Sequence, residues 1–185
     1  ISRSLQGSPP SFRSCRIARC HAKDCKQALD AGAGGIIVPM IESAEQLIQV
    51  RDACRWPPAG ARGVGFSRAN LFGKGFDEYK LEAQSPILVA MIENVLGVQE
   101  LDEILSVEGL DAIVIGPYDL SASLGIVGEF EHEKFLGAVA SIISKSRRTN
   151  VAAGIHIVAP SARELSKRKK MGFNFFLLLS CKTLR

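Results

Sequence analysis

Short runs of consecutive apolar residues recur along the chain, and each is followed by a polar segment whose apolar positions have helical spacing. Continuous apolar runs, unlike alternating ones, are typical of strands buried on both faces, and hence of a parallel sheet covered by helices. The predicted strands are residues 35–40, 87–92, 112–115, 151–157 and 175–179, with an earlier one around 12–18. The pattern therefore predicts an α/β fold of about six strand–helix units.

The segment between the second and third predicted strands is the most informative. Ser43 can cap a helix over Ala44–Cys54, which should stop at Trp56 because two prolines follow. Residues 57–75 come next, rich in Gly, Pro and Arg and without clear periodicity. Loops of this length in compact domains are usually functional.

Six units fit either an open doubly wound sheet or part of an eight-stranded barrel. In both architectures ligands bind just past the carboxyl ends of the strands. Polar residues at those ends are therefore the candidates for chemistry.

Composition restricts the class of protein. With 185 residues, 46% hydrophobic and 23% charged, the chain is expected to form one globular domain over residues 1–185. The net charge is only +4, and the basic residues Arg163 and 167–170 share a helical segment, so we expect an outer helix face and no nucleic-acid binding.

Five cysteines without a CxxC pair argue against a disulfide framework and a zinc site. No stretch approaches the ~20 apolar residues of a membrane span, and the polar start lacks the apolar core of a signal peptide. We expect a cytoplasmic protein without a membrane partner.

Three predicted strand ends carry polar groups. Glu93 follows the strand 87–92, Asp119 follows 112–115, and His156 lies within 151–157. Two carboxylates from adjacent strand ends can hold a hard cation such as Mg²⁺ or Mn²⁺ and leave positions open for a substrate. The alternatives are a helix-capping role for Glu93 and a turn role for Asp119, after Pro117.

Four ordered motifs resemble the pyruvate-dependent class II aldolases, the HpcH/HpaI aldolase or citrate lyase family. They are LDAGAGGIIVPMIESAEQ (29–46), RWPPAGARGVGFSRAN (55–70), VAMIEN (89–94) and GLDAIVIGPYDLSASLG (109–125). The resemblance spans roughly residues 16–160 and implies a TIM (β/α)8 barrel. The type member of this family cleaves 4-hydroxy-2-oxoheptanedioate.

The resemblance also implies roles for individual residues. Glu93 and Asp119 correspond to the metal ligands, for Mg²⁺, Mn²⁺ or Co²⁺, and Arg16 to the arginine that contacts pyruvate. Asp30 corresponds to the aspartate that orients a catalytic histidine, and the backbone of Gly116, Tyr118 and Asp119 would meet the substrate carboxylate.

The implied reaction cleaves or forms 4-hydroxy-2-oxo acids through a pyruvate enolate that the metal stabilises, with an aldehyde as the other partner. Family members assemble as homo-oligomers, commonly hexamers. Arg62 and Arg68 would face the aldehyde half or a neighbouring subunit, or would be surface arginines; these alternatives remain open.

The ends depart from the family. We expect a truncated barrel with strands 3 to 8 present and the first two strands and last helix missing, hence a fragment or degenerate copy. The family's Glu-His dipeptide has no match before Arg16, and His21, His132 and His156 have no assigned role. Two other functions stay open: a lyase for citramalyl- or malyl-coenzyme A, and a non-catalytic subunit.

Overall fold

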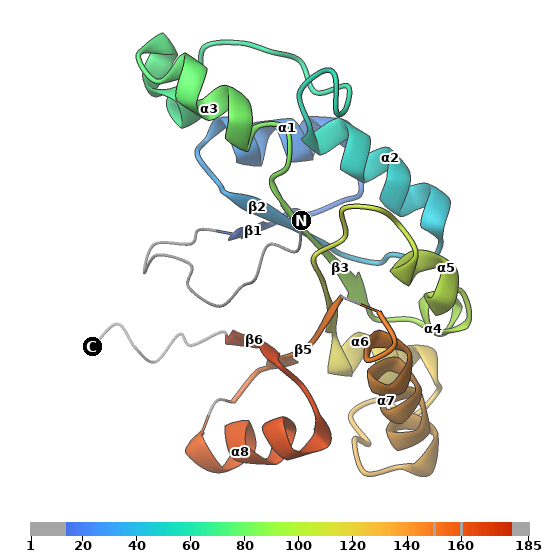
Figure 1. Ribbon diagram of the computed structural model, residues 1–185. Coiled ribbons are helices and arrows are strands. Elements are labelled where there is room, and N and C mark those ends of the chain that lie inside the picture. Colours follow the sequence, from blue (N-terminus) through green and yellow to red (C-terminus); the bar gives the residue numbers. More distant parts are fainter. Residues whose placement is uncertain (1–13, 150, 160, 179–185) are drawn as a thin grey trace.

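Six parallel strands form one sheet in the computed structural model, which describes residues 14–149, 151–159 and 161–178. The strands follow one another across the sheet in sequence order, each hydrogen-bonded to the next (Figure 1). They are β1 (Ser14–Arg16), β2 (Gly35–Val38), β3 (Ile87–Ile92), β4 (Ala112–Ile115), β5 (Ala152–Ile157) and β6 (Phe175–Leu178).

Helices connect the strands and lie along the outside of the curled sheet (Figure 1). They are α1 (Ala22–Asp30), α2 (Ala44–Cys54), the 3-10 helix η1 (Arg68–Gly73), α3 (Phe76–Glu82), α4 (Val95–Gln99), α5 (Leu101–Leu105), α6 (Pro117–Ser123), α7 (Glu133–Ser146) and α8 (Ala162–Met171). A doubly wound sheet would reverse its strand order and carry helices on both faces. The observed order is that of a TIM barrel, of which this sheet forms a part.

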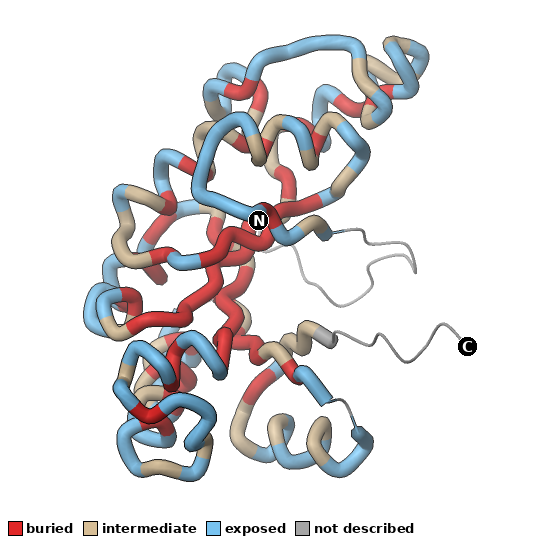
Figure 2. The backbone as a smooth tube through the Cα atoms, turned by 180° about the vertical axis from the view of Figure 1, so that it is seen from behind, coloured by how far each residue is buried: buried red, intermediate tan, exposed pale blue. Residues whose placement is uncertain are grey.

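Buried apolar residues lie on both faces of the sheet, so that red segments follow the strands in Figure 2. Alternate residues of a strand point to opposite faces. In β4, Ile113 and Ile115 join the large core between sheet and helices, whereas Ala112 and Val114 join a smaller core on the inner face. Burial on both faces explains why the strands are continuous apolar runs.

The predicted strands 87–92 and 112–115 are confirmed residue for residue. The predicted strand 35–40 ends at Val38 in the structure, and β5 begins one residue later than predicted. Leu179 and residues 12–13, the outer ends of two further predictions, lie outside the described residues. The helix Ala44–Cys54 is confirmed with its cap: Ser43 Oγ accepts a hydrogen bond from Gln46 N at 3.3 Å.

The segment 57–75 contains more structure than its lack of periodicity suggested. The Asn70 side chain organises it, accepting from the backbone N–H of Ser67 (2.9 Å) and Gly73 (3.2 Å) and donating to the Gly65 carbonyl (2.7 Å). These bonds hold Leu71 and Phe72 at φ values of 52° and 54°, in the left-handed region. Hydrogen bonds from a single side chain therefore build η1 where the lack of periodicity predicts only a loop.

Helix α8 carries the late basic cluster and buries none of its residues. Lys167 pairs with Glu131 and Arg168 with Glu164, at 2.8 and 2.6 Å. The expectation of an outer helix face is thus confirmed. Among the described residues, the longest apolar helical stretches fall short of what a membrane span needs.

Candidate active site

A cavity of about 170 Å³ opens at the carboxyl ends of the strands. Parallel strands bring these ends together at one edge of the sheet. The cavity is lined by Arg16, Met91, Glu93, Gly116, Pro117, Tyr118, Asp119, His156, Val158 and Leu177. All of the predicted site residues except Asp30 therefore lie around one cavity.

Glu93 follows β3 directly and is 2% exposed. Its Oε1 accepts a hydrogen bond from Met40 N at 2.8 Å, which fixes the carboxylate against the end of β2. Its other oxygen, Oε2, lies against Gly116, where a Cβ atom would come within 2.5 Å of it. Only glycine at this position leaves space for the carboxylate.

Asp119 lies in the first turn of α6, a short helix that begins at Pro117 directly after β4. Its carboxylate is within hydrogen-bonding reach of Glu93. Burial is the main cause that raises the pKa of Glu93; the Met40 N–H opposes this rise, the charge of Asp119 adds to it, and Arg16 lowers it. Two carboxylates this close repel each other when both are ionised, and a shared proton or a cation removes that repulsion.

The donor set fits a divalent metal. Glu93 and Asp119 offer hard oxygen atoms, and no third His, Cys, Asp or Glu of the described chain joins them in a cluster. Mg²⁺ is commonly held by one or two carboxylates and keeps its other positions for water or substrate.

The capping and turn alternatives do not describe the local structure. Asn94 caps α4, because its Oδ1 accepts a hydrogen bond from Gly97 N at 2.8 Å, and its Nδ2 donates to Glu42 Oε1 at 2.5 Å. Asp119 lies inside a helical turn. Glu93 is therefore not the cap of α4, and Asp119 is part of a helix rather than of an isolated turn.

Arg16 and Tyr118 stand at the mouth of the cavity. Arg16 ends β1 and is exposed, and the Tyr118 ring packs edge-on against Phe130, with centroids 5.0 Å apart. The N–H of Gly116 is already donated to Ile92 O at 3.3 Å. Backbone donors for a substrate carboxylate would thus come from Tyr118 and Asp119, in the first helical turn, whose N–H groups have no intrahelical partner.

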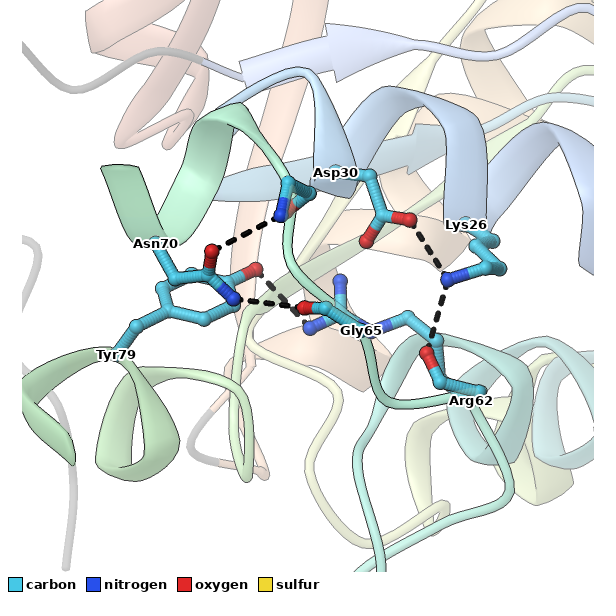
Figure 3. A network of polar contacts seen from close by, with 8 residues as sticks. Lys26, Asp30, Arg62, Gly65, Asn70 and Tyr79 are labelled. Carbon is cyan, nitrogen blue, oxygen red and sulfur yellow. Dashed lines mark hydrogen bonds and ion pairs between the residues drawn. The ribbon is translucent and has the colours of Figure 1, made fainter. Parts of the chain in front are cut away.

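Asp30 lies elsewhere. Helix α1 runs back from the carboxyl ends of the strands, so Asp30, its last residue, sits beside the start of β2 at the opposite edge of the sheet. There it accepts a hydrogen bond from Lys26 Nζ at 2.7 Å, and Lys26 also donates to the Gly63 carbonyl at 2.9 Å (Figure 3). Within one chain the structure does not bring Asp30 to Glu93, and its catalytic role stays a prediction.

Arg62 is buried rather than being a surface arginine. It is 3% exposed, and its guanidinium lies over the rings of Trp56 and Tyr79, 5.6 and 5.7 Å from their centroids. Its Nη2 donates to Tyr79 Oη at 3.0 Å, whereas Nε and Nη1 find no acceptor among the described residues (Figure 3). Arg68, by contrast, is exposed.

The three histidines have different environments. His21 and His132 each cap a helix through Nδ1, accepting from Lys23 N and Lys134 N at 3.2 Å. His156 lines the cavity, and burial, followed by the charge of Arg16, lowers its pKa. From the sequence alone His156 has no assigned role, although the alternation along β5 places it on the inner face.

Comparisons with known proteins agree with this geometry. Residues 13–178 match the family model described as HpcH/HpaI aldolase/citrate lyase. A hydroxypyruvate/pyruvate aldolase of Roseobacter denitrificans is 46% identical over 134 residues, which are 70% of this chain and 52% of that protein. A 4-hydroxy-2-oxovalerate aldolase of Novosphingobium aromaticivorans is 34% identical over 83% of this chain and 58% of its own length.

A crystal structure from Burkholderia cenocepacia, of an HpcH/HpaI aldolase/citrate lyase family protein, superposes with a TM-score of 0.83. It is 29% identical, and the match covers 91% of this chain and 67% of that one. The chain thus spans just over half the length of these two curated relatives.

Proposed function

Because this chain belongs to the HpcH/HpaI aldolase/citrate lyase family, we propose that it forms the metal- and pyruvate-binding part of a class II aldolase. The reaction would cleave or form 4-hydroxy-2-oxo acids, with pyruvate and an aldehyde as the two halves. One observation carries the proposal: Glu93 is buried at a strand end with Asp119 within hydrogen-bonding reach.

Glu93 and Asp119 would hold a divalent metal such as Mg²⁺, Mn²⁺ or Co²⁺, which supplies Lewis-acid polarisation of the keto group of the 2-oxo acid when bound. The protein keeps the Glu93 carboxylate in place before any ligand arrives. Met40 N–H fixes one oxygen of Glu93, and Gly116 leaves space for the other.

The remaining cavity residues would orient the 2-oxo acid. Arg16 places a fixed positive charge where negative charge develops on the keto oxygen as the carbon–carbon bond breaks. The N–H groups of Tyr118 and Asp119 can donate hydrogen bonds to the substrate carboxylate at the start of α6. All of these groups would contact the pyruvate half of the substrate. They therefore do not determine which aldehyde forms the other half.

The names of the two curated relatives support this substrate class. Both are aldolases, one named for hydroxypyruvate and pyruvate and the other for a 4-hydroxy-2-oxo acid. We infer the same 2-oxo acid chemistry for this chain, since its carboxylates and Arg16 surround a single cavity.

The decisive experiment follows pyruvate itself. Exchange of the pyruvate methyl protons with D₂O, monitored by NMR with Mg²⁺, reports activation of the 2-oxo acid without any aldehyde. We expect Asp119→Asn to slow the exchange by more than about 100-fold, because losing a group that merely orients a metal ligand already costs about 10–100-fold.

Glu129→Gln is the matched control, since it removes one carboxylate from an exposed position outside the cavity. It should exchange at the wild-type rate. Exchange that persists in EDTA, or in Asp119→Asn at the wild-type rate, would contradict a metal-dependent reaction at this site.

A further inference from the structure

His156 shares one interior layer of the sheet with Glu93. The register of the sheet pairs Ile92 with Ile115 and Ile115 with Ile155. One residue further along, Glu93, Gly116 and His156 fall side by side on three neighbouring strands. Alternation places all three on the inner face, because Ile115, Ile155 and Ile157 belong to the core on the helical side.

Gly116 leaves the space between these two side chains open. Adjacent strands lie about 4.8 Å apart, so the backbones of Glu93 and His156 are separated by about 10 Å. The residue between them has no side chain, and both flanking side chains line the same cavity. A small ligand held by Glu93 and Asp119 would therefore have the imidazole as its neighbour on the β5 side.

The imidazole has an unmet hydrogen-bonding capacity. Its Nε2 is buried without a hydrogen-bond partner among the described residues. A buried polar atom left unpaired costs about 1–3 kcal/mol, so it is informative where one occurs. Burial and Arg16 lower the pKa of His156, and a neutral imidazole can donate from one nitrogen and accept at the other.

A second hollow of about 300 Å³ continues the cavity beyond His156. The two hollows share four residues: Pro117, Tyr118, His156 and Val158. The second one extends along the end of β5 to polar side chains of the α8 region: Ser161, Glu164 and Arg168. A substrate that extends away from the carboxylate pair thus passes His156 before it reaches this partly polar hollow.

We propose that His156 determines specificity for the aldehyde half of the substrate, by hydrogen-bonding through its imidazole to a hydroxyl group on that half. The expected preference is for hydroxylated aldehydes over apolar ones of equal size. This inference rests on the proposed aldolase function and adds the substrate class that the Glu93–Asp119–Arg16 set leaves open.

Glycolaldehyde and propanal provide the test, because they have the same number of heavy atoms and differ by a hydroxyl in place of a methyl group. The measurement is the ratio of kcat/KM for the two aldehydes in Mg²⁺-dependent addition to pyruvate, using the full chain. Intrinsic differences in aldehyde reactivity cancel when this ratio is compared between wild type and variant.

His156→Leu should lower the glycolaldehyde-to-propanal ratio by about tenfold, the effect of one lost neutral hydrogen bond. His156→Gln retains a donor and an acceptor and should recover part of the ratio. His156→Phe keeps a ring but has no polar side-chain atom, and it should lower the ratio to the same extent as His156→Leu. With two apolar variants, a folding defect in one of them does not decide the result.

Two failures remain distinguishable. If the wild-type chain does not exchange the pyruvate methyl protons with D₂O in Mg²⁺, the proposed function is wrong and this inference falls with it. If exchange occurs while a folded His156→Leu or His156→Phe keeps the wild-type ratio, only the role of His156 is overturned.

Discussion

Replacing Gly116 by alanine tests the carboxylate pair with a single methyl group. The backbone at Gly116 has φ −91° and ψ 96°, a conformation close to the extended region that alanine adopts without strain. The added Cβ would lie 2.5 Å from Glu93 Oε2 and 3.0 Å from Glu93 Cβ. The substitution therefore acts through contact with Glu93 rather than through backbone strain.

The size of the effect follows from this overlap. Ordinary contacts begin near 3.4 Å, so the Glu93 carboxylate must withdraw by roughly 1 Å. Misplacement of a reacting group by about 1 Å can cost about 100-fold in rate, and disturbing the support of a metal ligand typically costs about 10–100-fold in affinity. We expect Gly116→Ala to bind Mn²⁺ about 10–100-fold more weakly by calorimetry, with a correspondingly slower methyl exchange.

Gly137→Ala is the matched glycine control. Gly137 lies inside α7, is exposed, and has no atom within 4 Å of a built Cβ. Alanine there should stabilise the helix by about 0.5–1 kcal/mol and leave Mn²⁺ affinity unchanged. A folded Gly116→Ala chain with wild-type Mn²⁺ affinity would refute the assignment of Glu93 as a metal ligand.

Three further substitutions test other parts of the structure. Burial raises the pKa of Glu93 above its ordinary 4.5. The metal-free protein therefore loses stability as the pH rises through this raised pKa, because the buried carboxyl group becomes charged. Glu93→Gln should raise Tm in EDTA near about pH 8, but not near about pH 4. The same variant should lose the rise in Tm that Mn²⁺ gives the wild type. Tyr79→Phe removes the acceptor of the buried Arg62 Nη2 and should lower the free energy of unfolding in urea by about 1–3 kcal/mol; an unchanged value would mean that Arg62 has another partner. Ser43→Ala removes the cap of α2 and should cost about 1 kcal/mol in the same assay, whereas no loss would show that the 3.3 Å bond contributes nothing.

The sequence predicted the central strands of the sheet well because they are buried on both faces. A strand such as Ile87–Ile92 has no polar face to interrupt its apolar run, so its bounds are visible in the sequence. Helix Ala44–Cys54 was equally visible, since a serine cap and two prolines mark its ends. Local signals sufficed where local residues determine the structure.

The segment 57–82 could not be predicted in the same way, because individual side-chain contacts shape it rather than a repeating apolar pattern. Asn70 holds η1 through backbone groups on both sides, and Arg62 is buried only because Trp56 and Tyr79 enclose it. An arginine in a glycine-rich stretch otherwise indicates an exposed loop. The distance of Asp30 from the cavity was likewise not predicted from the motif, since it depends on the direction in which α1 runs back along the sheet.

The candidate site was predicted in part. Strand ends and motifs indicated Glu93, Asp119 and Arg16, and the structure places all three around one cavity. His156 was noted but left without a role, because a single histidine in an apolar strand is as readily a buried, hydrogen-bonded residue as a site residue. The alternation along β5 indicates its place: Ile155 and Ile157 face the helices, so His156 between them faces the interior of the sheet. Only the register of the sheet then shows which residues lie beside it.

The sequential order of the strands also constrains how this site can form during synthesis. Each strand pairs with the one made immediately before it, so the sheet can grow from β1 to β6 by closing one connection at a time. The two proposed metal ligands, Glu93 and Asp119, follow the third and fourth strands, whereas His156 lies in the fifth. A nascent chain would therefore acquire the two carboxylates that we propose as metal ligands before His156, to which we assign the choice of aldehyde.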